Sequence, residues 1–255
     1  MTFETNAGTP AEHAQPIGGP SPGPDRAASP TPVQIRLQIL TTEHWSLLAS
    51  RGLAWNEVFA RAGMYLSALS ASIVALGLIG GIDHFGDAFF SFAFVLLPVV
   101  LFIGIGTWLR MGTSNYHDVR TIVGMNRIRG AYLEIAPDLE PYFVMGIHDD
   151  PQGIGITMAL PPGMPVIAHL ISSTPFLVVI LNAVVAGALG ALVLIRVIGA
   201  SGAAAVIGAS AVALLVLAFE MAGARRRIAE GQRAVRPMFP TPPDDPRDPV
   251  ARQLL

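Results

Sequence analysis

The sequence contains no cysteine and no lysine, and only 13% of its 255 residues are charged. Without cysteine the chain forms no disulfide and offers neither a thiol nucleophile nor a thiolate metal ligand, so cysteine usage gives no information on the redox compartment. The basic residues are all arginine, which we interpret as the codon bias of a GC-rich genome. A formal net charge of −2 argues against a nucleic-acid partner, because phosphate binding needs a surplus of clustered cations.

Long stretches without any charged residue are abundant instead. Residues 62–82, 88–109, 170–195 and 197–219 each reach the roughly 20 apolar residues that a helix needs to cross the hydrocarbon core of a bilayer. Hydrophobic residues make up 52% of the chain. We therefore predict an all-α, polytopic membrane protein in which four transmembrane helices form two hairpins, with amphipathic cytoplasmic helices beside them.

The arginines indicate the orientation, because loops rich in arginine stay on the cytoplasmic side. One outer turn, residues 83–87, has no basic residue, and the other has only Arg196. Both termini are therefore expected in the cytoplasm, and the membrane is expected to be a bacterial plasma membrane. On the opposite side lie Arg51, Arg61, Arg110, Arg120, Arg127, Arg129, Arg225, Arg226 and Arg227.

Composition divides the chain into six segments. Residues 1–32 form a Pro- and Gly-rich tail that we expect to be disordered, because it has little apolar surface to bury. The remaining segments are a cytoplasmic amphipathic helix (33–61), the first hairpin (62–109), a cytoplasmic helix with an irregular loop (110–165), the second hairpin (166–221) and a basic, then Pro-rich cytoplasmic tail (222–255).

Apolar residues outside the spans recur every three or four positions, which is typical of a helix with one apolar face. The first such helix should begin near Val33 and run into the first span, and the second should end before Pro137. We expect these helices to pack on each other or to lie on the lipid surface; the alternative is a dedicated surface for a partner. The two faces comprise Trp45, Leu48, Gly52, Trp55 and Phe59, and Val119, Ile122, Met125, Ile128, Tyr132 and Ile135.

The loop after Pro137 holds the strongest candidates for chemistry, His148, Asp149 and Asp150. Carboxylates and an imidazole can bind a divalent ion, but their spacing matches no known metal motif. We favour a solvated loop whose acids pair with nearby arginines, and we expect no metal and no cofactor. The loop also contains Pro161, Pro162 and Pro165, which exclude a regular helix there. The other acids of the set are Glu134, Asp138 and Glu140, and the arginines are Arg120, Arg127 and Arg129.

Few polar side chains lie in or near the spans, where such groups indicate function. Asn182 is the one amide in mid-span, and we expect it to bond to a neighbouring helix. Arg196 ends the third span and can extend its guanidinium to the interface. Glu220 lies at the inner boundary and is expected to pair with one of the arginines 225–227. Because no acid stands in mid-span, a proton-coupled carrier is not favoured.

Small residues recur every four positions along three spans, which lets helix backbones approach closely. We expect two of these rows to pack inside the bundle and the third to serve a contact between copies. Pro98 should kink the second span. The rows are Gly63, Ser67, Ala71 and Ala75; Ala183, Gly187 and Ala191; and Ala205, Ala209 and Ala213.

Residues 40–51 (LTTEHWSLLASR) and 125–134 (MNRIRGAYLE) resemble segments of uncharacterised integral membrane proteins of actinobacteria. The likeness covers about residues 38–150 and implies no activity. A two-span hairpin flanked by long cytoplasmic helices is also similar in layout to SLATT domains, which are proposed membrane effectors of bacterial conflict systems. The second hairpin of this chain departs from that layout.

Three functions remain open at this point. The first is a non-enzymatic, oligomeric membrane protein that acts as a scaffold, a partner-binding subunit or a pore-forming effector, in contact with the lipid bilayer and with itself or another membrane protein. The second is a small transporter or channel subunit, with Asn182 and Pro98 lining a path. The third, a metal-dependent membrane enzyme, would use His148, Asp149 and Asp150.

Overall fold

The computed structural model describes residues 31–158, 168, 171–234 and 236–242. Four helices are long and apolar enough to span a membrane, which makes the chain an all-α polytopic membrane protein as predicted. Of the tail predicted as disordered, 1–32, residues 1–30 lie outside the described residues, whereas Thr31 and Pro32 begin α1. Prolines 161, 162 and 165 and the end of the chain from 243 also lie outside the described residues. The elements are α1 (Pro32–Asp83), α2 (Asp87–Ile135), η1 (Pro137–Tyr142), α3 (Pro151–Thr157), α5 (Thr174–Arg196) and α6 (Gly202–Ala234).

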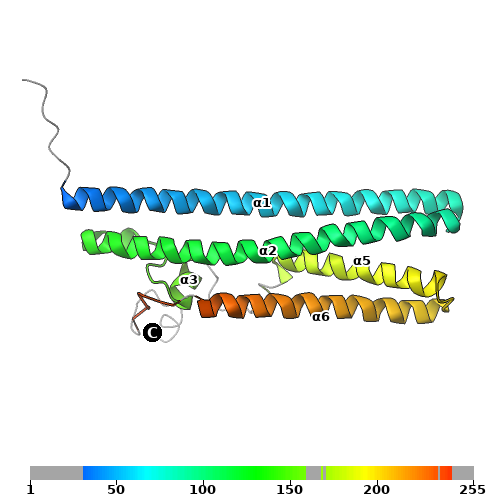
Figure 1. Cartoon of the computed structure of the whole chain (residues 1–255). Helices are drawn as coiled ribbons and strands as arrows, with labels where there is room; N and C mark the ends of the chain where they lie inside the picture. The colour runs from blue at the N-terminus through cyan, green and yellow to red at the C-terminus, as the bar shows by residue number, and fades with distance from the viewer. Residues whose placement is uncertain (1–30, 159–167, 169–170, 235, 243–255) are drawn as a thin grey trace, which may run out of the picture.

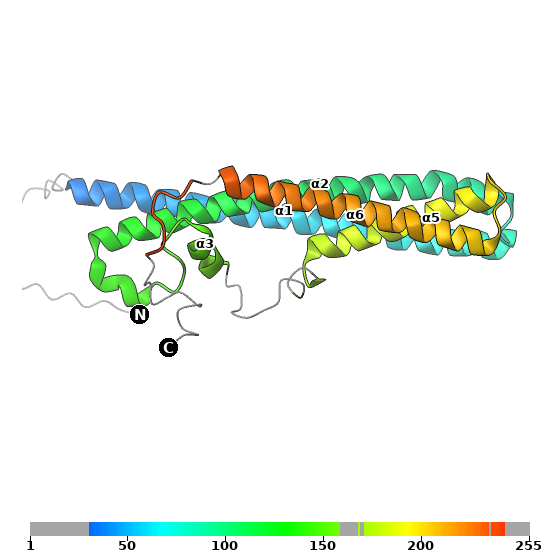
Figure 2. The same ribbon diagram turned by 90° about the horizontal axis from the view of Figure 1, so that it is seen from below.

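The four long helices form two antiparallel hairpins, α1/α2 and α5/α6, and α2 lies between α1 and α5 (Figure 1). Both interhelical turns, 84–86 and 197–201, lie at one end of the bundle, which we call the turn end. At the other end α1 and α2 continue side by side well past the start of α5 (Figure 2). We call this extension, residues 32–61 of α1 and 110–135 of α2, the stalk.

The stalk exists because neither helix stops at the membrane boundary. With 52 residues α1 is about 78 Å long, against a hydrocarbon core of about 30 Å. Thr31 begins it with a capping box, accepting from the backbone N–H of Gln34 while the Gln34 side chain accepts from Thr31 N–H. The predicted cytoplasmic helix and the first span are thus one helix. Helix α2 likewise continues through Pro98 and ends before Pro137, as predicted.

Two segments predicted outside the spans contain more helix than expected. The loop after Pro137 is not uniformly irregular, because Asp150 caps the short helix α3 by accepting from Gly153 N–H, and Pro151 occupies its first turn. The basic segment after residue 221 continues α6 instead of leaving it. Gly223 lies within this helix, where it packs against Trp108 of α2. A Cβ at this position would lie 3.0 Å from the Trp108 ring.

At the turn end an ion pair connects the two hairpins. Arg196 at the end of α5 forms an ion pair with Asp87 at the start of α2, and its guanidinium lies over the ring of Phe90. The chain reverses at His84 and Phe85, which both adopt positive φ values of 49° and 59°. The side chain of Asp83 stabilises this turn by accepting from the backbone N–H of Phe89 at the start of α2.

The rows of small residues on α5 and α6 pack against each other. Ala183 and Gly187 of α5 are buried against α6, where a Cβ on Gly187 would lie 3.0 Å from the carbonyl oxygen of Ala209. The row on α1 does not pack in the bundle. Nothing lies within 4 Å of a Cβ built on Gly63. Ser67 and Ala71 are exposed, whereas Ala75 is partly buried.

Replacing Gly187 by Ile should therefore destabilise the α5/α6 hairpin, because the new side chain meets the backbone of α6. Overpacking of this kind costs about 1–3 kcal/mol. Thermal unfolding of the protein in detergent, followed by circular dichroism, should give a lower Tm than the wild type. Gly106→Ile is the matched control, since nothing lies within 4 Å of a Cβ there. Equal Tm values for the two variants would contradict the close packing of α5 on α6.

Candidate functional site

The seam between α1 and α2 in the stalk is displaced from its predicted position. Most α1 residues that face α2 lie one position earlier in the sequence than the residues predicted to do so. The buried face is therefore rotated by about 100° around the helix. The predicted residues Trp45, Leu48 and Phe59 instead point outward and are 67%, 43% and 56% exposed. On α2 the prediction is confirmed, since Ile122, Met125 and Ile128 are buried. The α1 residues partly or fully buried one position before the predicted face are Leu40, His44, Leu47, Arg51, Ala54 and Val58; of the predicted face, Trp55 is also partly buried.

Polar contacts explain the displaced seam. Asp118 of α2 is only 4% exposed and accepts from Nε of Arg51 at 2.6 Å and from the indole N–H of Trp55 at 3.2 Å. His44 stacks on Tyr132 with ring centroids 5.9 Å apart. A buried carboxylate must be paired, so Asp118 brings both Arg51 and the indole of Trp55 into the seam, whereas Trp45, Leu48 and Phe59 stay exposed.

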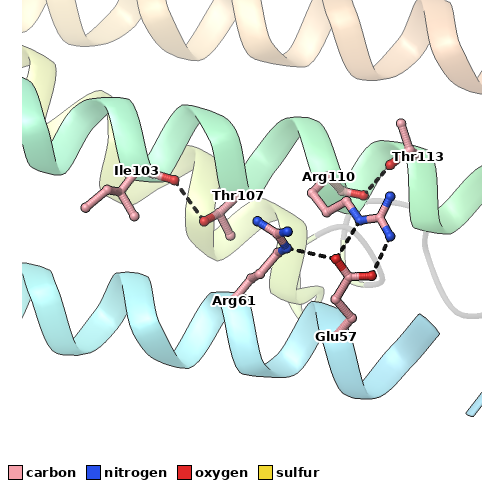
Figure 3. Close-up of polar contacts among 6 residues, drawn as sticks. All are labelled: Glu57, Arg61, Ile103, Thr107, Arg110 and Thr113. Atoms are coloured by element: carbon pink, nitrogen blue, oxygen red, sulfur yellow. Dashed lines mark hydrogen bonds and ion pairs between the residues drawn. The ribbon is translucent and has the colours of Figure 1, made fainter. Parts of the chain in front are cut away.

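At the boundary between stalk and membrane, Glu57 of α1 lies between two arginines (Figure 3). It accepts from Nε of Arg61 at 3.0 Å and is paired with Arg110 of α2 through both of its oxygens. The hydrogen bonds from Arg110 and then from Arg61 lower the pKa of Glu57. These ion pairs join α1 and α2 where the charged stalk meets the apolar spans.

Further along the stalk, the segment that follows α2 folds back against this helix around Asn126, which is fully buried. Its Nδ2 donates to the carbonyl oxygens of His148 and Gly153, at 2.7 and 3.1 Å. Its Oδ1 accepts from the hydroxyl of Thr157 at 2.7 Å and from Arg129 at 2.9 Å. One amide thereby holds both the approach to α3 and α3 itself against the stalk.

Two of the three metal candidates, Asp149 and Asp150, bind the chain's own C-terminal segment, and the backbone carbonyl of the third, His148, accepts from Asn126. Asp149 is fully buried and accepts from the backbone N–H groups of Met238 and Phe239, both at 2.8 Å, and from Nε of Arg127 at 2.8 Å. Its own N–H donates to the carbonyl oxygen of Phe239 at 3.3 Å. The predicted pairing of a loop acid with Arg127 is found. The expectation that Asp149 is solvated is wrong, because its side chain is buried.

Asp150 completes this contact, which we call the C-terminal latch. Its carboxylate accepts from the N–H and the hydroxyl of Thr241, at 3.0 and 2.8 Å, in addition to capping α3. No three His, Asp or Glu side chains of the described residues gather where they could hold a metal ion. Glu134 lies elsewhere, paired with Arg36 of α1 at 3.0 Å, and Asp138 and Glu140 are exposed.

A second polar cluster lies inside the bundle and was not predicted as a unit. Asn182 of α5 is fully buried, and its Nδ2 donates to Oε1 of Glu220 on α6 at 2.9 Å. The bond to a neighbouring helix agrees with the expectation for Asn182. The predicted pairing of Glu220 with an arginine is wrong, because Glu220 is 2% exposed and points into the bundle. Of those arginines, Arg227 lies over the ring of Trp108.

The other two helices also meet this cluster. Tyr65 of α1 is fully buried, and its ring lies against Gly104 of α2. A Cβ on Gly104 would lie 1.9 Å from Oδ1 of Asn182 and 2.8 Å from Tyr65. Only glycine at 104 therefore admits both side chains. Tyr65, Gly104, Asn182 and Glu220, one from each spanning helix, make up what we call the core cluster.

A simple signal in the sequence marks these partners. Asn182 and Glu220 both lie 19 residues from Ser201, in the second turn. Tyr65 and Gly104 lie 20 and 19 residues from Phe85, in the first turn. In an antiparallel hairpin, residues at equal distances from the turn lie opposite each other, so polar residues placed symmetrically about each turn predict these contacts.

No family model matches the chain, and no curated protein and no solved structure matches it either.

The C-terminal latch should open in acid. Burial raises the pKa of Asp149, but the N–H groups of Met238 and Phe239 and the guanidinium of Arg127 outweigh it, so the pKa is lowered; the same balance, with Gly153 and Thr241 as donors, lowers that of Asp150. The latch is therefore fully formed above the ordinary carboxyl pKa of about 4 and is lost as the pH falls through the lower folded value.

Because the chain has no cysteine, Met238→Cys gives a unique site for a spin label, and the bonded atom there is the backbone N–H. The label should be less mobile at neutral pH than when Asp149→Asn is added or when the pH falls below the lowered pKa of Asp149. Asp138→Asn, at an exposed acid of η1, is the control and should leave the mobility of the label unchanged. A label that is equally mobile in all variants at neutral pH would rule out the latch.

Proposed function

We propose that this protein is a self-associating membrane scaffold whose copies join through α1. The observation that carries this proposal is the uncovered face of α1, which has α2 as its main neighbour along its whole length. Gly63 lies about 200° around the helix from Tyr65, which is buried in the bundle, so the small-residue row lies opposite the packed face.

This outer face is continuous from membrane to stalk. Trp45 and Gly63 are 18 residues, or about five helical turns, apart and therefore lie on one line along α1. Phe59 lies between them and is more than half exposed. The face thus combines small residues inside the hydrocarbon core, where close helix approach favours association, with large apolar side chains in the stalk.

Lipid can cover the part of the face inside the bilayer but not the part in the stalk. Apolar surface left in water costs about 25 cal/mol per Å², so Trp45, Leu48 and Leu53, which are all exposed, favour a protein neighbour. Two copies in one bilayer have the same orientation, so their α1 helices meet in parallel about a two-fold axis. That arrangement places Gly63 against Gly63 and Trp45 against Trp45, which favours a second copy as the neighbour.

The orientation is part of the same proposal. The stalk and the end of α6 carry the arginines, whereas the turn end has only Arg196, and arginine-rich segments stay in the cytoplasm. We place the stalk, the latch and both termini in the cytoplasm of a bacterial cell, with the turn end outside. A cytoplasmic stalk that pairs copies also fits the effector role suggested by the SLATT-like layout.

Self-association can be tested without disturbing the fold of one copy. Gly63→Ile with Ala71→Ile places bulk on the open face of α1, which should weaken association by about tenfold or more, equivalent to about 1.4 kcal/mol. Light scattering in detergent, with the detergent mass subtracted, should show a dimer or larger for the wild type and a shift to monomer for the double variant. Gly106→Ile, an open position on α2, should not change the mass. A monomeric wild type would refute this proposal.

The orientation can be tested with single cysteines, since none is native to the chain. Phe85→Cys stands in the turn end and is 64% exposed, and Met238→Cys stands at the latch and is 66% exposed. A membrane-impermeant thiol reagent added to intact cells should label Phe85→Cys and should reach Met238→Cys only after permeabilisation. The reverse pattern would invert the topology.

A further inference from the structure

The core cluster has too few hydrogen-bond donors for its acceptors. Three of its buried atoms have no partner among the described residues: the hydroxyl of Tyr65, Oδ1 of Asn182 and Oε2 of Glu220. Only the hydroxyl can donate, and it has one proton. Whichever oxygen it reaches, one buried acceptor stays empty, and buried polar atoms without partners are rare in folded proteins.

The charge of the cluster is also unbalanced if Glu220 is ionised. Among the described residues no arginine forms an ion pair with Glu220: Arg61 and Arg110 pair with Glu57, and Arg227 lies over Trp108. Glu220 lies about 27 Å along α6 from Gly202, near the stalk end of a span about 30 Å long, and is only 2% exposed. A lone carboxylate in such surroundings is strongly disfavoured.

One added positive charge corrects both deficits. We propose that the core cluster binds a single monovalent cation, a proton or an alkali metal ion, through Oε2 of Glu220, Oδ1 of Asn182 and the hydroxyl of Tyr65. All three ligands are oxygens, which suits a hard cation. One carboxylate neutralises one positive charge, whereas a divalent ion would leave an excess charge in the bilayer. The bond from Asn182 to Oε1 leaves Oε2 for the cation.

Gly104 supports this assignment. The absence of its side chain brings Asn182 Oδ1 and the Tyr65 ring against the backbone of α2, so three helices and Glu220 of the fourth converge on one point. The inference is independent of self-association, because every residue of the cluster belongs to one copy. It bears on the transporter alternative, since a buried acid lies inside the bundle at its stalk end, while the expectation that no acid stands in mid-span is unchanged.

Two measurements on the full-length protein in detergent distinguish the two cations. In the first, Tm is followed in sodium, lithium, potassium or choline chloride at constant ionic strength. An alkali ion in the cluster should raise Tm above the choline value. In the second, infrared spectroscopy at neutral pH looks for the carbonyl band of a protonated carboxylic acid. A proton in the cluster should give that band without any preference among the salts.

Glu220→Gln removes the charge and supplies an N–H donor, so it should abolish the salt effect or the infrared band, whichever the wild type shows. Tyr65→Phe keeps the ring and removes one ligand, which should weaken an alkali ion about tenfold or shift the band of a protonated acid. Glu230→Gln, at an exposed acid of the same helix, is the control and should behave as the wild type. Neither effect in the wild type, or equal loss in Glu230→Gln, would overturn the proposal.

Discussion

The structure depends on the packing of α2, because this helix contacts α1 along its length and also α5, α3 and the loop after Ile135. Its residues define each level of the molecule in turn. Gly104 admits the core cluster, Arg110 pairs at the membrane boundary, Asp118 sets the seam of the stalk and Asn126 holds the loop. Helices inside a bilayer gain little from burying apolar surface against each other, so close packing and polar contacts of this kind carry much of the association.

The spans, the end of α2 before Pro137 and the buried face around Ile122 could be predicted from the sequence, because they follow from hydropathy and helical period alone. The seam on α1 could not, since that reasoning assigns the largest apolar residues to the interior, and here Arg51 and His44 occupy it. The latch joins residues about 90 positions apart. No local pattern predicts a backbone N–H of Phe239 as the partner of Asp149.

The core cluster lies between these cases. The sequence marks Asn182 and Glu220 as separate polar positions but does not mark Tyr65, and the pairing predicted for Glu220 with the arginines 225–227 is wrong because those residues are its neighbours only along the helix. The bond to Asn182 follows instead from the hairpin, because a helix pair brings together residues on either side of a turn. Polar residues in membrane helices are therefore better read across a turn than along the helix.

The equal spacing about the first turn has a consequence for how this hairpin can change length during evolution. Arg36 with Glu134, Arg51 with Asp118 and Glu57 with Arg110 are all centred within two residues of Phe85. An insertion in one helix alone would shift every contact beyond it by about 100° and 1.5 Å per residue. Length variants should thus carry matched changes in both helices, while the tip beyond Arg36 and Glu134 is free to lengthen.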